Sequence, residues 1–176
     1  SDSVDIDALI SSKSIPFNYT PSSNDIKKIK QADIIVINGL QLEGALENTL
    51  NQKRFNQKQI INLESGIKKK LLLKSDIFPA GYDPHIWHDL DLWSEATQYL
   101  STQLQLILPN QSDEIEYRKN VFLMDLSKLK RKLILLMIDV PLEKRQFVTE
   151  FNTFKYYEKQ YALKTFAVKQ DFKTTD

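Results

Sequence analysis

The feature that most constrains the fold is a continuous apolar run, ADIIVIN at residues 32–38, which Gly39 ends. A run without polar alternation suits a strand that is buried on both faces, as in a parallel sheet covered by helices. A second short apolar run lies at residues 59–63. Helical patterns at residues 25–31 and 41–52 precede and follow the first run. Alternating strands and helices are typical of an α/β lobe.

Two further patterns extend this lobe. Residues 4–10 alternate apolar and acidic side chains, which predicts an additional strand. Residues 93–106 are predicted to be helical, and a much longer helix is expected from about 114 to 138. The long helix has a regular apolar stripe of Phe122, Leu126, Leu129, Leu133, Leu136 and Val140.

The remaining residues predict a strand at 146–149, a helix at 152–161 and a strand at 162–168. The predicted fold class is therefore α/β, with a short parallel-sheet lobe and flanking helices, one long backbone helix, and a fragment of a second α/β lobe. We expect an N-terminal α/β lobe at residues 1–110, a long linker helix at 111–140 and a partial C-terminal lobe at 141–176.

Composition excludes several classes of function. The 24 basic and 23 acidic residues give a formal net charge of +1, which argues against nucleic-acid binding. The chain has no cysteine, so disulfides, thiolate zinc sites and cysteine nucleophiles are excluded. No apolar run reaches membrane-spanning length. Carboxylate pairs occur, but no pocket signature or base accompanies them, so we expect no enzyme.

Three motifs in order carry a family resemblance. PSSNDIKKIKQADIIVINGLQLE at residues 21–43, DPHIW at residues 83–87 and QFVTEFNTFKYY at residues 146–157 have the spacing expected, with the long helix before the third. Together they resemble the signatures of bacterial ABC-importer binding proteins for zinc and manganese. The resemblance covers nearly the whole chain, from Val4 to Asp176.

This resemblance implies two α/β lobes bridged by a rigid helix, with metal bound between them by histidines and a carboxylate. His85 matches the second family ligand. Phe17 stands where the first ligand, in a P-H-x-Y pattern, is expected, and Phe151 stands at the third. The fourth would lie beyond Asp176, and the family's opening strand and helix would precede Ser1, so we expect a truncated and degenerate relative.

Alternatives remain open for the metal chemistry. His85 and His88 lie three residues apart and could form a rearranged site with Asp83 or Asp89, although His85 as an ancestral remnant is the simpler reading. Oxygen from Glu150 or Asn152 could replace the third ligand. We expect no cofactor, with zinc or manganese possible only as weakly bound ions.

Phe17 and Phe151 have a simple structural interpretation. Apolar rings would fill and dry the space left by a lost metal, and the two rings could touch. If Phe17 is buried, Phe17→Ala should lower stability by about 3–5 kcal/mol. The aromatic residues 154, 157 and 161 step along one helical face and are expected to form core.

Two functions follow from these observations. The first is a degenerate relative of metal-importer binding proteins, which would need the importer's membrane components as partners if transport is retained. The second is a secreted or surface interaction module, effector-like or adhesin-like, with an unknown protein partner. In either case we expect export to the periplasm, cell surface or medium. A homodimer, including one that exchanges the C-terminal strand, could cover apolar surface of the partial lobe.

Overall fold

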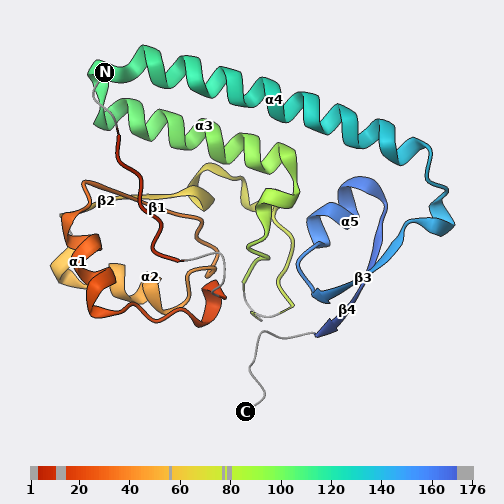
Figure 1. Cartoon of the computed structure of the whole chain (residues 1–176), viewed down its shortest axis with the longest axis horizontal. Coiled ribbons are helices and arrows are strands. Elements are labelled where there is room, and N and C mark those ends of the chain that lie inside the picture. Colours follow the sequence, from red (N-terminus) through yellow and green to blue (C-terminus); the bar gives the residue numbers. More distant parts are fainter. Residues whose placement is uncertain (1–3, 11–14, 56, 77, 79–80, 170–176) are drawn as a thin grey trace.

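A computed structural model describes residues 4–10, 15–55, 57–76, 78 and 81–169. Within these residues two small parallel sheets are connected through a pair of long helices, as Figure 1 shows. The first half of the chain contains α1 (Ser23–Gln31), β1 (Ile34–Ile37), α2 (Ala45–Leu50) and β2 (Gln59–Asn62). The second half contains α3 (Leu90–Ile107), α4 (Ser112–Ile138), β3 (Gln146–Phe151), α5 (Lys155–Tyr161) and β4 (Lys164–Lys169). This arrangement confirms the predicted α/β class.

The first sheet forms as the apolar runs predict. β1 and β2 are parallel, with Ile34 opposite Gln59. One face of β1 packs with α1 and α2, where the buried cluster contains Ile29, Ile35, Ile37, Leu46, Leu50 and Phe55. Ile61 points to the opposite side and joins the cluster below α3. Among the described residues this sheet has two strands, and Val36 is 47% exposed rather than buried on both faces.

The predicted strand at residues 4–10 is wrong, since these residues form neither helix nor strand. An isolated strand has unpaired backbone groups, and alternation alone supplies no neighbour to pair with. Val4 and Ile6 are 65% and 88% exposed. Leu9 and Ile10, in contrast, pack against the cluster around α1. Contact with the core, rather than sheet pairing, therefore holds the end of this segment.

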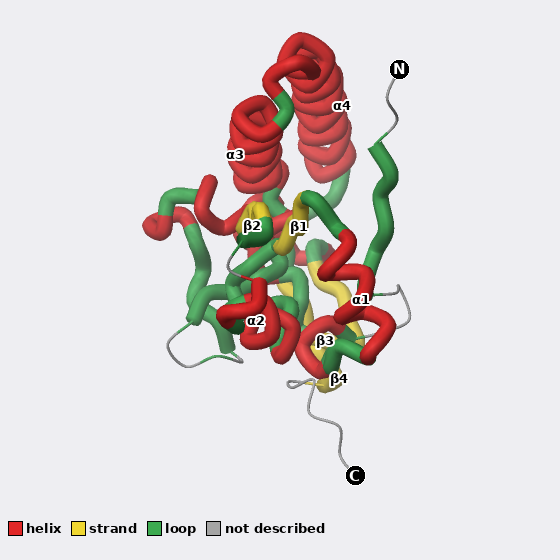
Figure 2. Tube along the Cα trace, turned by 90° about the vertical axis from the view of Figure 1, so that its left-hand side faces the viewer, coloured by secondary structure: helices red, strands yellow, loops and turns green. Residues whose placement is uncertain are grey.

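The helices α3 and α4 run side by side in opposite directions (Figures 1 and 2), joined by a 3-10 turn at Pro109–Gln111. Asp89 caps α3, because its carboxylate accepts hydrogen bonds from the backbone of Asp91 and Leu92. The predicted stripe on α4 is only partly buried: Leu126 is 8% exposed, whereas Leu136 is 55% exposed. α3 covers a single side of α4, which leaves the flanks of the stripe in solvent. No helix in the described part of the chain is long and apolar enough to cross a membrane.

The last three elements form a parallel β3–α5–β4 unit, with Gln146 opposite Lys164. Arg145 joins this unit to the end of α4, because its guanidinium donates to the carbonyls of Val140 at 2.9 Å and Tyr161 at 3.1 Å. Tyr156 of α5 is fully buried and belongs to the core cluster of the first half. Tyr156 thus lies at the centre of the contact between this unit and the rest of the core.

Candidate metal centre

The retained family ligand, His85, lies on a turn that leads into α3. His85 and Asp83 are 4% and 3% exposed. The Nδ1 atom of His85 is 2.7 Å from Oδ1 of Asp83, and the same oxygen accepts the backbone N–H of His85 at 2.9 Å. Of the two neutral tautomers, a carboxylate at Nδ1 favours the one that has its proton there and its lone pair on Nε2. This is the arrangement by which proteins orient a metal-binding histidine.

Two side chains from distant elements hold the backbone of this turn. Asn38, at the end of β1, donates from Nδ2 to the carbonyl of Pro84 at 3.1 Å. Tyr156 donates from Oη to the carbonyl of Asp83 at 2.9 Å and accepts the backbone N–H of Leu73 at 3.2 Å. Burial raises the pKa of Tyr156, so its hydroxyl keeps its proton. The position of His85 therefore depends on both the first sheet and α5.

The Asn38-Gly39 motif and Glu43 build a tight turn beside this site. The Glu43 carboxylate accepts the backbone N–H groups of Asn38 at 2.6 Å and Gly39 at 3.1 Å. Gly39 has φ of +80°, and a Cβ there would lie 2.1 Å from Oδ1 of Asn62. Only glycine fits this position. The motif thus shapes the backbone that presents Asn38 to the His85 turn.

Glu47 places a second carboxyl group next to Glu43. Burial raises the pKa of both groups, and for Glu47 the neighbouring Glu43 charge adds to the effect and brings its pKa to about 7. Sequence reasoning gave neither residue a role, because the like-charge contact arises only when α2 folds back over the turn.

Phe17 lies beside His85, as expected for the first ligand position. It is on a 3-10 turn at Pro16–Asn18 and is half-buried. Its ring centroid is 6.1 Å from that of His85, in an edge-on arrangement, and 5.6 Å from that of Phe78. The turn sits directly on Gly44, where a Cβ would lie 2.3 Å from the Phe17 carbonyl oxygen. Because the ring is only half-buried, the loss of stability expected for Phe17→Ala on the assumption of full burial is too large.

Phe151 ends β3 and is also half-buried. The Nζ atom of Lys169 lies 5.2 Å from its ring centroid. The Phe17 ring contacts those of Phe78 and His85, and the predicted contact between Phe17 and Phe151 stays a prediction. The neighbouring polar groups have other partners: Glu150 pairs with Lys169 at 2.7 Å, and Asn152 donates to Asp76 at 2.9 Å.

His88 lies in an aromatic cluster rather than beside a carboxylate. Its ring centroid is 4.6 Å from Phe154, 5.6 Å from Trp87 and 6.4 Å from Tyr157. Burial, and then the nearby His85, lower the pKa of His88 to about 4, although Asp83 opposes the shift. Over the described ranges, no group of three or more histidine, aspartate or glutamate side chains is placed to hold a metal ion. Trp87 also contacts His85, with centroids 5.2 Å apart.

The comparisons with known proteins agree with this fold. The manganese-binding lipoprotein MntA of Bacillus subtilis is 32% identical over 158 residues, which cover 85% of this chain and 48% of that protein. The zinc-binding protein TroA of Treponema pallidum is 28% identical over 147 residues, covering 83% and 46%. The chain therefore spans about half the length of the curated relatives it matches.

Solved structures give the same result. The periplasmic zinc-binding protein TroA from Treponema pallidum superposes with a TM-score of 0.78 at 26% identity, covering 87% of this chain and 54% of that one. A structure of ZnuA shares the fold, with a TM-score of 0.83 at 23% identity, covering 96% and 63%. These relatives are described as metal-binding proteins, and this chain shares their fold.

The family model described as zinc-uptake complex component A, periplasmic, matches residues 1–176. This chain belongs to that family. The relationship predicted from the three motifs is confirmed.

Proposed function

We propose that this protein is an exported solute-binding component of a metal importer, periplasmic or at the cell surface, whose metal site lacks donors at two ligand positions. The names of the relatives support the class of solute, since they are described as manganese-binding and zinc-binding proteins. The same relatives support the location, because they include lipoproteins and a periplasmic protein. The partners would be the membrane components of the importer, and the metal would be cargo rather than a cofactor.

The observation that carries the proposal is the contact between Phe17 and His85. The two rings lie 6.1 Å apart between centroids, so the residue at the first ligand position is beside the retained histidine. Phenylalanine has no lone pair, and zinc sites need three or four donors. His85 keeps its orienting carboxylate at 2.7 Å, but one imidazole is too few ligands for tight binding. An interaction module on the same scaffold is not favoured by these relatives.

Restoring the missing donors tests this proposal. Phe17→His and Phe17→His/Phe151→His are compared with the natural chain in zinc and manganese titrations by calorimetry. Phe122→His adds a histidine on α4, where the side chain is 43% exposed, and is the matched control. We expect the double variant to bind at least about tenfold more tightly, which is about 1.4 kcal/mol. The proposal would be contradicted if the natural chain bound the metal as tightly as the double variant, or if Phe122→His gained as much metal affinity as the double variant.

A further inference from the structure

The turn between β1 and α2, residues 39–44, contains more left-handed backbone than its glycines explain. Leu40 and Gln41 have φ of +57° and +66°. Left-handed backbone is unfavourable for residues that carry a Cβ, and it persists only where the surrounding structure holds it. The 39–44 turn is therefore a strained segment whose conformation depends on other groups.

Two carboxylates supply the hydrogen bonds that hold this turn. The Glu43 carboxylate is 7% exposed as a residue and accepts the backbone N–H groups of Asn38 at 2.6 Å and Gly39 at 3.1 Å. The carboxylate of Glu64, which follows β2, accepts the N–H group of Leu40. Three consecutive N–H groups at the start of the turn thus depend on two carboxylates.

A third carboxyl group, that of Glu47 on α2, lies against Glu43. Its Oε1 atom is buried and, among the described residues, has no hydrogen-bond donor as a partner. Two ionised carboxyl groups in a buried contact repel each other, and an unpaired buried charge is unfavourable. A proton on Glu47 removes both costs, because the carboxylic acid then donates to the Glu43 carboxylate.

The surroundings decide which of the two groups keeps the proton. The N–H groups of Asn38 and Gly39 favour the ionised form of Glu43. Burial, and then the charge of Glu43, raise the pKa of Glu47 to about 7. Glu64 is a further carboxylate that acts on Glu47 in the same direction. Among the described residues, no lysine, arginine or histidine forms an ion pair with any of these three carboxyl groups.

We propose that the proton shared by Glu43 and Glu47 makes the 39–44 turn a pH-sensitive switch, which is ordered while the proton is bound and loosens when the proton is lost. Loss of the proton places a second negative charge beside Glu43. The two carboxylates then separate, and the N–H groups of Asn38 and Gly39 lose their acceptor.

The switch reaches the His85 turn through one side chain. Asn38 donates from Nδ2 to the carbonyl of Pro84 at 3.1 Å, so a loosened turn no longer fixes the residue before His85. Any consequence for metal binding rests on the proposed function. The switch itself does not, and it is tested on the metal-free chain, so the two proposals can fail separately.

Hydrogen exchange measures the switch at the N–H groups that it holds. Protection factors of the Asn38 and Gly39 N–H groups in the 176-residue chain are measured by NMR near pH 6 and near pH 8, and are corrected for the intrinsic pH dependence of exchange. Both should fall by about three- to tenfold in the natural chain between these values, because each pH unit above the pKa changes the opening equilibrium by at most about tenfold.

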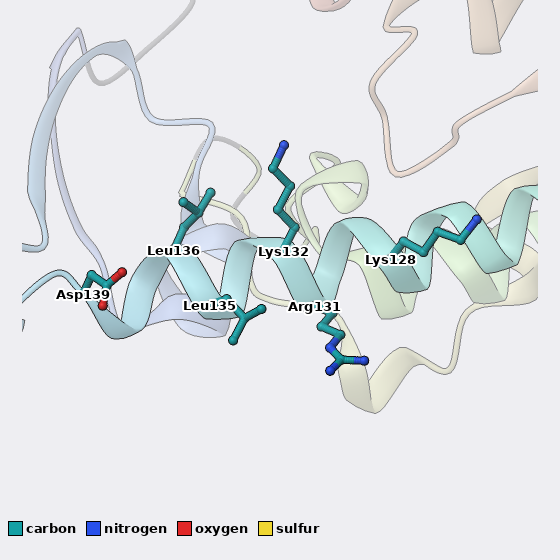
Figure 3. Close-up of a pocket in the computed structure, with 6 residues that line it drawn as sticks. All are labelled: Lys128, Arg131, Lys132, Leu135, Leu136 and Asp139. Carbon is teal, nitrogen blue, oxygen red and sulfur yellow. The ribbon is translucent and has the colours of Figure 1, made fainter.

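Two variants separate the switch from general effects of pH. Glu47→Gln keeps a hydrogen-bond donor for Glu43 but cannot titrate, so protection should be the same at both pH values. Asp139→Asn is the matched control, since it also converts a carboxylate to an amide, and it should keep the natural pH dependence. Figure 3 shows Asp139 at the end of α4, which lies across the molecule from α2 in Figure 1. Circular dichroism checks that both variants are folded.

A second measurement needs no variant. The carboxyl carbon of Glu47 in the natural chain is followed by NMR as the pH is raised, and its midpoint should lie near 7. The proposal is overturned if this midpoint lies near 4.5, if the natural chain protects the two N–H groups equally at both pH values, if Glu47→Gln keeps the pH dependence, or if Asp139→Asn removes it.

Discussion

Tyr156→Phe should be the most informative single-atom change in this protein. The side chain of Tyr156 is 0% exposed, and its hydroxyl has two backbone partners on the first half of the chain. It donates to the Asp83 carbonyl at 2.9 Å and accepts the Leu73 N–H at 3.2 Å. Removing the oxygen leaves both backbone groups without this partner. An unsatisfied buried group costs about 1–3 kcal/mol. Because the hydrogen bond from Leu73 is only partly buried, we expect a total loss of about 2–4 kcal/mol.

Urea unfolding measures this loss, and an unchanged slope with urea concentration would show that the unfolded state is unaffected. Tyr117→Phe is the control, because Tyr117 is 65% exposed and makes no hydrogen bond from its hydroxyl within the described residues. Hydrogen exchange should also speed up in the turn that contains Asp83 and His85. A loss below about 0.5 kcal/mol, equal to that of the control, would refute the view that Tyr156 fixes this turn.

Three further predictions concern single side chains. The pKa of His88 is about 4 in the folded protein and 6.5 in a free side chain, so the unfolded state binds more protons between these two pH values. Stability should therefore fall by about 1–2 kcal/mol as the pH drops from 6.5 to 4. In thermal melts, His88→Phe should remove this contribution to the pH dependence of stability. Burial, and then the Glu43 charge, raise the pKa of Glu47 to about 7 from 4.5, so its contribution to stability is lost as pH rises through 7. In urea unfolding, Glu47→Gln should stabilise the fold by about 1 kcal/mol near pH 8 and hardly at all near pH 5. Equal effects at both pH values would contradict the raised pKa of Glu47. Phe17→Ala should lower the free energy of unfolding by about 1–3 kcal/mol in urea unfolding, which is less than the loss for a fully buried ring. No loss would show that the contact between Phe17 and His85 is not stabilising.

Local patterns in the sequence predicted most of the secondary structure. Apolar runs found β1 and β2, and the long stripe found α4, because strand and helix periodicities depend on neighbouring residues alone. The strand expected at residues 4–10 fails for the opposite reason, since strand formation requires a partner from elsewhere in the chain. The apolar stripe does not predict how far α4 is buried, because periodicity does not say how much of the helix its neighbours cover.

The site residues could be predicted only where they form part of a family motif. The DPHIW motif identified His85, and the family pattern placed Phe17 close to it, as the 6.1 Å ring contact shows. The residues that hold His85 in position, Asp83 and Tyr156, were not predicted to do so. The sequence presents Asp83 only as a possible metal ligand and gives Tyr156 no role in holding the His85 turn. The hydrogen bond from Tyr156 to Asp83 joins residues 73 positions apart, a relation that no local pattern contains.

The most direct test of the central claim is a zinc and manganese titration of the chelator-treated 176-residue chain, by calorimetry with a parallel thermal melt. Because Phe17 and Phe151 offer no donor, we predict no tight binding of either ion and no rise in melting temperature. Tight one-to-one binding with a raised melting temperature would contradict the account, since it would show that His85 and its neighbours already form a working metal site.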